Sequence, residues 1–172
     1  MDIVSKAPDS YASFWSYASK PQRDLLLQGN YLTEMVTKHD GYHFEDYSFL
    51  IFPYAKAYEG FLKQLFLDVG FINRLDYISS HLRLGKLLSP NLRYRLGDRS
   101  LYGKLQSTAS PELADKIWQT WTVGRNQIFH YYPHNIKSVS FEEASGIIAD
   151  IIRTMEEAYQ ILKPKERTHE HM

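Results

Sequence analysis

The stretch DYSFLIFPYAKAYEGFLKQLFLDV, residues 46–69, decides the fold class of this chain. Its apolar residues recur at spacings of three and four, which is typical of a helix with a broad packing face. Pro53 either starts this helix or kinks it, and Gly70 is a plausible stop. The apolar positions are Leu50, Ile51, Tyr54, Tyr58, Phe61, Leu62, Leu65, Phe66 and Val69.

Further helices are predicted on both sides of this stretch. One runs from Pro21 to Lys38, where proline suits the first turn because its missing N–H is not needed there. Another runs from Arg74 to Ser89, and Ser89-Pro90 opens a short helical piece. Gly97 and Gly103 mark a loop-rich stretch. The residues expected to point inward from the 74–89 helix are Leu75, Ile78, Leu82 and Leu87.

The C-terminal half contains two clear helix starts. Ser110-Pro111-Glu112 combines an N-cap, a proline in the first position and an acid in the first turn. This helix should end near Tyr131, because Pro133 disfavours helical geometry at the residue before it. Ser140 and Glu143 match a capping box for a last helix that stops before Pro164. Nothing indicates a confident strand, so the prediction is an all-α bundle of about five helices.

Composition sets limits on the class of protein. A length of 172 residues suits one domain, expected over 1–164 with Phe14, Trp15 and Tyr17 packing as an arm, followed by a polar flexible tail over 165–172. The chain has no cysteine, which excludes disulfides and thiolate chemistry. The formal net charge is zero, so any attraction to nucleic acid must be local.

No signal peptide or membrane span is visible in the sequence, and a cytoplasmic protein without membrane contact is expected. No cofactor or metal site is expected either. His39, His43 and His81 lack ligand spacing, and His169 and His171 lie in the tail.

The segment Arg125-Asn126-Gln127-Ile128-Phe129-His130 carries the chemistry. It has the form R-N-x-x-x-H and resembles the HEPN superfamily, whose hallmark is Arg, four to six residues and then His, often with a polar residue after the Arg. Tyr132 extends the match to the R-x4-H-x-Y form of the HepT-type toxins. The resemblance implies a HEPN-type bundle that forms homodimers with both motifs facing one cleft. It also implies metal-independent RNA cleavage by 2′-hydroxyl attack.

The motif's spacing fits a composite site. Asn126 and His130 are four residues apart and share a helix face. Arg125 and His130 are five apart, roughly 140° around a regular helix, so a local distortion or a second copy must bring them to one phosphate. In the last turn of the helix, the dipole favours the protonated form of His130, which can act as general acid or base. Arg125 offers a charged fork for the phosphate.

A second element lies on the early helix, where Lys56 and Glu59 are three residues apart. Without a functional role, Lys56 and Glu59 would form a surface ion pair worth a few tenths of a kcal/mol. The layout is also similar to the HEPN domain of the RNase LS (RnlA-type) toxins, in which a basic residue and a Glu, three apart on an early helix, join the Arg and His. This chain has Lys56 where that pattern has Arg, and the two are not interchangeable at a bidentate site.

A local excess of basic residues could bind RNA. Between residues 74 and 104, seven basic residues stand against two acids, an excess of five positive charges. Tyr94 and Tyr102 lie among them and could stack on bases. The alternative is a solvated basic face balanced by acids elsewhere. The basic residues are Arg74, Arg83, Lys86, Arg93, Arg95, Arg99 and Lys104.

Three functional hypotheses follow from these features. The first is an endoribonuclease, a toxin or phage-defence effector, with Arg125, Asn126, His130 and Glu59 as catalytic residues and Lys56 and Tyr132 in support. The second is a HepT-like toxin that a nucleotidyltransferase antitoxin inactivates by attaching AMP to Tyr132; the alternative role of Tyr132, which the sequence favours, is packing before Pro133. The third is a non-catalytic dimerisation or binding module that kept the motif.

Overall fold

The structure of the protein is a computed structural model that describes residues 13–38 and 42–164. This part of the chain contains eight α-helices and no strand, with short 3₁₀ and π segments between helices. The predicted all-α bundle is confirmed, but with eight helices rather than about five. The proposed tail, 165–172, lies outside the described residues. The helices are α1 (Lys20–Lys38), α2 (Ser48–Asp68), α3 (Arg74–Ile78), α4 (Leu84–Leu88), α5 (Arg93–Leu96), α6 (Leu101–Thr108), α7 (Pro111–Trp121) and α8 (Phe141–Leu162).

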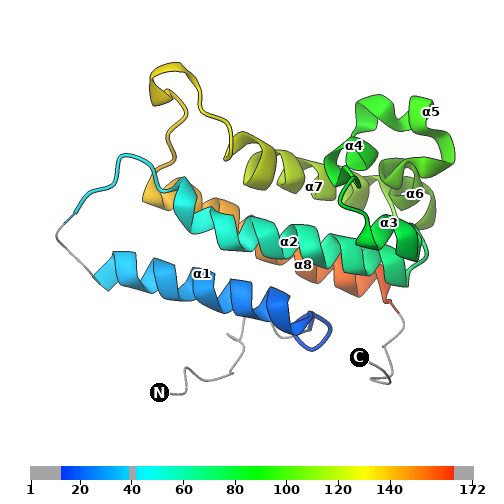
Figure 1. The fold of residues 1–172 in the computed structure, drawn as a ribbon, viewed down its shortest axis with the longest axis horizontal. Coiled ribbons are helices and arrows are strands. Elements are labelled where there is room, and N and C mark those ends of the chain that lie inside the picture. Colours follow the sequence, from blue (N-terminus) through cyan, green and yellow to red (C-terminus); the bar gives the residue numbers. More distant parts are fainter. Residues whose placement is uncertain (1–12, 39–41, 165–172) are drawn as a thin grey trace.

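Helix α2 is the centre of the bundle. In Figure 1, α1 lies along one side of α2, α7 lies along the other, and α8 runs behind it. Its predicted apolar positions from Leu50 to Phe66 are buried. The helix begins at Ser48 and runs through Pro53, so of the two alternatives a start at Pro53 is wrong. Gly70, with φ 78°, ends it as expected, because only glycine adopts such a φ without strain.

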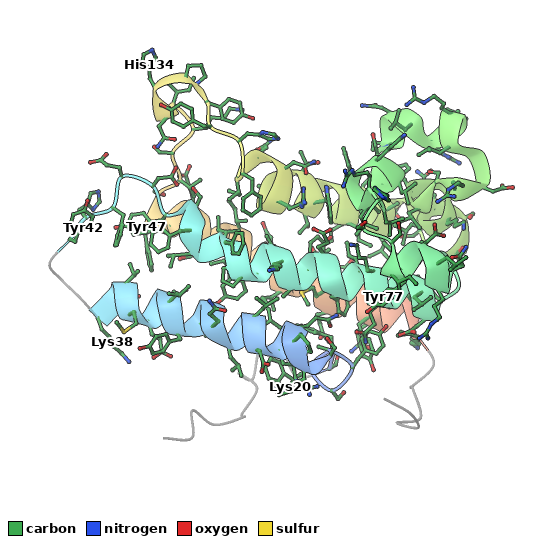
Figure 2. The ribbon with its side chains drawn as sticks, viewed as in Figure 1. Lys20, Lys38, Tyr42, Tyr47, Tyr77 and His134 are labelled. Carbon is green, nitrogen blue, oxygen red and sulfur yellow. The ribbon has the colours of Figure 1, made fainter. Side chains whose placement is uncertain are left out.

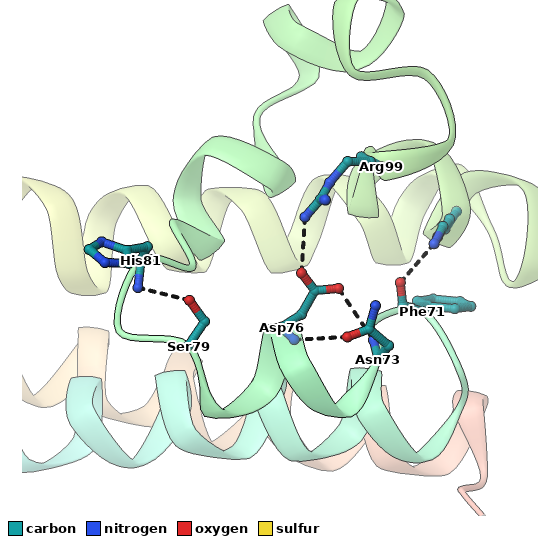
Figure 3. A network of polar contacts seen from close by, with 7 residues as sticks. Phe71, Asn73, Asp76, Ser79, His81 and Arg99 are labelled. Carbon is teal, nitrogen blue, oxygen red and sulfur yellow. Dashed lines mark hydrogen bonds and ion pairs between the residues drawn. The ribbon is translucent and has the colours of Figure 1, made fainter.

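The predicted single helix over 74–89 is wrong. It is split into α3 and α4, which Figure 1 places at one end of the bundle. Ser79 is extended (ψ 129°), and its hydroxyl accepts a hydrogen bond from the His81 N–H at 3.1 Å (Figure 3). Serine side chains compete in this way with the helical backbone pattern. As a result Leu75 and Ile78, expected inward, are 75% and 66% exposed.

Helix α6 was missed, because Gly97 and Gly103 indicated only loops. Gly97, with φ 52°, follows α5, but Ser100 then starts a new helix by accepting a hydrogen bond from the Gly103 N–H at 3.0 Å. Leu101 and Leu105 are buried in the core on this helix. A glycine in the first turn is tolerated here because the cap and the buried leucines stabilise the helix.

The remaining predicted helix starts are confirmed. Ser110 accepts a hydrogen bond from the Leu113 N–H at 3.1 Å, and Ser140 and Glu143 form a reciprocal capping box. The aromatic arm also packs as predicted: Phe14 is fully buried, with its ring 5.7 Å from that of Phe61. In the described part of the chain, no helix combines the length and apolar character required to cross a membrane.

Candidate active site

The backbone changes its winding where the motif begins. Helix α7 ends at Trp121, and the chain continues as a π-helical turn, Thr122–Gln127. The α-helix therefore ends before the predicted end near Tyr131, and the π-turn is a local distortion of the kind that the spacing of Arg125 and His130 left open. Gly124 packs directly against α8: a Cβ at this position would lie 3.0 Å from Cδ1 of Ile151. The π-turn thus lies against α8, and such turns, which insert one extra residue per turn, occur frequently at functional sites.

His130 lies beyond the helix rather than in its last turn. Its backbone N–H reaches the Gln127 carbonyl at 3.4 Å, and its side chain is exposed. The helix-dipole effect expected for His130 has no basis in this position, because the effect fades within the last turn. Tyr132 is extended, as expected before proline, and the chain then turns at His134 at the tip of the loop (Figure 2).

The loop that carries His130 is anchored at its far end. Asn135 and the Val139 N–H both donate to the Asp46 carboxylate, at 3.3 and 3.4 Å. The Val139 carbonyl accepts from the N–H of Tyr47, at the start of α2 (Figure 2), at 2.8 Å. Burial raises the pKa of the Asp46 carboxyl, but the hydrogen bonds from Ser48, Asn135 and Val139 outweigh it, so the pKa is lowered. A charged Asp46 therefore holds the loop against α2.

Arg125 is held in place by two neighbours. Its Nε donates to Oε2 of Glu59 on α2 at 3.3 Å, and its guanidinium lies 5.0 Å from the centre of the Trp121 ring. The Arg125 and Glu59 side chains are 40% and 28% exposed, and Trp121 is buried. A guanidinium on an aromatic face and against a carboxylate has few alternative orientations. The side chain is therefore fixed yet open to solvent.

Glu59 belongs to a small charged cluster. It also pairs with Lys63, one turn along α2, at 3.5 Å between Nζ and Oε1. Two cations, Arg125 and Lys63, and one anion, Glu59, give the cluster a net charge of +1. The predicted surface ion pair between Lys56 and Glu59 is not formed, since the ion pairs of Glu59 are with Lys63 and Arg125. Lys56 is exposed, and its Nζ lies 6.0 Å from the centre of the Phe52 ring.

The structure brings some motif residues together and not others. Arg125 meets Glu59, as expected if an early-helix acid reaches the motif. Within the described residues, no hydrogen bond joins the side chains of Arg125 and His130, and Asn126 is partly exposed without a side-chain hydrogen bond. Tyr132 is half-buried, with Nζ of Lys137 4.1 Å from its ring centre.

The basic stretch over 74–104 is less available to RNA than its sequence indicates. Arg99 pairs with Asp76 at 3.0 Å (Figure 3). Lys104 donates to the Phe71 carbonyl at 2.7 Å. Tyr102 is buried and donates to Asp115; this hydrogen bond and the burial raise the pKa of its hydroxyl. The expectation that Tyr102 stacks on bases is therefore wrong. Tyr94, by contrast, is 90% exposed.

Three aromatic residues beside the motif were not singled out from the sequence. Trp121 supports Arg125, and Phe129, next to His130, packs edge-on against Phe52 with ring centres 5.5 Å apart. A sequence signal existed for Phe52, which lies seven residues before Glu59 and therefore shares its helix face. None existed for the contact between Phe52 and Phe129, which depends on how the segment from the π-turn onward packs on α2.

Comparisons of the chain with protein-family models, curated proteins and solved structures return no match. Across residues 13–38 and 42–164, no group of three or more His, Asp or Glu side chains is placed to hold a metal ion.

Proposed function

We propose that this protein is a HEPN-type endoribonuclease that cleaves RNA without a metal ion. One observation carries the proposal: Glu59, from a distant part of the sequence, holds Arg125 at the start of the R-x4-H motif. The hydrogen bond uses Nε, and among the described residues neither Nη group of Arg125 is hydrogen-bonded. Two donors on a fixed cation are thus available to a phosphate, five residues before an exposed histidine.

The proposed chemistry uses the RNA's own nucleophile. The ribose 2′-oxygen attacks the adjacent phosphorus and the bond to the 5′-oxygen breaks, which gives a 2′,3′-cyclic phosphate and a 5′-hydroxyl. His130 takes the 2′-hydroxyl proton or gives a proton to the leaving 5′-oxygen. Arg125 stabilises the charge that develops on the phosphate oxygens. Asn126, beside Arg125 in the sequence and partly exposed, is a further candidate donor, and DNA, which lacks the 2′-hydroxyl, is no substrate.

A homodimer fits the separation of the two main groups. Because Arg125 is bound to Glu59 while His130 lies exposed in the loop beyond the π-turn, a cleft shared by two copies would let the arginine of one copy and the histidine of the other act on one phosphate. Such a nuclease would act as a toxin or phage-defence effector, and an antitoxin protein would be its partner.

The test compares Arg125→Ala and His130→Ala with Leu75→Ala, which truncates an exposed side chain on α3. On single-stranded RNA with EDTA present, the first two variants should lose at least about 100-fold in rate, as removal of one transition-state donor or proton carrier does. The control should cleave at the wild-type rate. Full activity in either motif variant, with unchanged circular dichroism, would refute the proposal.

The two alternative functions would give different experimental results. AMP attachment at Tyr132 would appear as a mass increase in protein co-expressed with its neighbouring gene, although the contact between Lys137 and its ring also gives Tyr132 a packing role. A non-catalytic dimerisation or binding module would bind RNA or partners but leave both structured and unstructured RNA intact.

A further inference from the structure

A groove lies beside the motif, between α1, the start of α2 and the residues before His130. Its volume is about 440 Å³, within the range of small-molecule sites. Its lining includes Gln28 and Leu32 from α1, Phe49 and Phe52 from α2, and Ile128 and Phe129. We propose that this aromatic groove binds a nucleobase of single-stranded RNA whose phosphate lies at Arg125. The inference rests on the proposed function and names how its substrate is positioned.

One stripe of α2 connects the groove with the phosphate site. Phe52, Lys56, Glu59 and Lys63 lie at positions i, i+4, i+7 and i+11, which share one helix face. Two residues of this stripe contact the motif segment: Phe52 meets Phe129 and Glu59 meets Arg125. Seven residues at the helical rise separate Phe52 from Glu59 by about 10 Å. That length accommodates a nucleotide with its phosphate at one end and its base at the other.

The side chains of the groove suit a base rather than a purely apolar ligand. Phe52 and Phe129 are 49% and 48% exposed, so each keeps ring surface open for stacking. Gln28 is exposed at the rim and carries an amide that can donate to and accept from a base edge. Every base can stack on an aromatic ring, whereas hydrogen bonds from the Gln28 amide would favour bases with a matching edge.

Charge around the groove favours nucleic acid over a second copy of this chain. Lys56 is exposed and lies over Phe52, between the groove and the Glu59 cluster. The cluster itself carries a net charge of +1 from Arg125, Lys63 and Glu59. The aromatic surface is thus continuous with a cationic one, which matches the alternating base and phosphate of a single strand.

The experiment combines a changed substrate with changed rings. A short RNA with a single cleavable ribose is made intact or with an abasic nucleotide on either side of the scissile phosphate. Cleavage is measured for the wild type, Phe52→Leu, Phe129→Leu and the distant control Leu75→Ala. Leucine keeps the apolar bulk but removes the ring, so folding is preserved.

In the wild type and in Leu75→Ala, one abasic position should raise KM about 5- to 100-fold, the effect of losing one stacked base. Both phenylalanine variants should show a raised KM on intact RNA and a much smaller response to the abasic position. Equal KM for intact and abasic RNA in the wild type would overturn the inference. An abasic effect in both phenylalanine variants as large as in the wild type would also overturn it. So would dissociation of the phenylalanine variants into smaller species on gel filtration, because the groove would then be a contact between copies of the chain.

Absence of cleavage in the wild type would refute the proposed function and not the groove. The same intact and abasic oligonucleotides, labelled and titrated with protein in fluorescence anisotropy, then decide the inference. A tighter Kd for intact RNA that Phe52→Leu abolishes supports it, and equal Kd values overturn it.

Discussion

Removing the Glu59 carboxylate should separate RNA binding from RNA cleavage. In Glu59→Ala, Arg125 loses the acceptor 3.3 Å from its Nε, while its contact with the Trp121 ring remains. The cluster changes from two cations and one anion to two cations, Arg125 and Lys63, with no anion. The guanidinium therefore becomes both less constrained and more strongly attracted to phosphate.

The magnitudes follow from the exposure of the pair. With side chains 40% and 28% exposed, the ion pair of Arg125 and Glu59 should contribute about 0.2–1 kcal/mol to stability. RNA should bind more tightly at low salt, and the slope of log K against log salt should steepen by up to about 0.7, the value for one more phosphate contact on a single strand. The cleavage rate at saturation should fall about 10- to 100-fold, because small displacements of a catalytic group are costly.

The assay is single-turnover cleavage beside anisotropy titrations at several salt concentrations, with Glu59→Gln as the matched control. Glutamine keeps an oxygen acceptor for the Nε of Arg125 but removes the charge. It should therefore bind RNA as tightly as Glu59→Ala and cleave faster than it. Cleavage by Glu59→Ala at the wild-type rate would refute the idea that Glu59 positions Arg125.

Two further predictions concern the scaffold. Gly85→Ala should destabilise the protein by about 1–3 kcal/mol in urea unfolding, because its Cβ would lie 2.5 Å from Nε1 of the buried Trp121. Gly146→Ala, where a Cβ meets nothing within 4 Å, should be neutral or stabilising, and an equal loss in both would contradict the packing reason. The pKa of the Asp46 carboxyl is lowered in the folded state. The charged carboxylate therefore stabilises the fold at pH values above its unfolded-state pKa, and this stabilisation is lost as the pH falls through its folded-state pKa. The difference in free energy of unfolding between the wild type and Asp46→Asn should be largest near neutral pH and should disappear in acid. A difference that grows in acid would contradict the lowered pKa.

The sequence predicted best those helices in which apolar residues recur at helical spacing along the buried face. Helix α2 and helix α8 each have one long apolar pattern, and α8 has a complete capping box at Ser140 and Glu143. The split between α3 and α4 could not be predicted from the same pattern. Leu75 and Ile78 fit a buried face, yet the local hydrogen bond between Ser79 and His81 ends the helix first.

The candidate site was predictable in its residues but not in its geometry. The R-x4-H spacing singled out Arg125 and His130, and Glu59 was the acid expected to reach the motif. Within the π-turn, Gly124 packs against Ile151, a contact between residues far apart in sequence. Local periodicity contains no information on such a contact, so the sequence predicted a helix to near Tyr131 and allowed for a local distortion without placing the π-turn.

The most direct test of RNA cleavage by 2′-hydroxyl attack uses one substrate in two forms. A single-stranded RNA is compared with the same oligonucleotide carrying a 2′-deoxyribose at the cleaved position, both in EDTA. We predict that the first is cut to a 2′,3′-cyclic phosphate and a 5′-hydroxyl, that the second stays intact, and that His130→Ala cuts neither. Cleavage of the deoxy-substituted strand at the same position, or a product with a 5′-phosphate, would contradict the account.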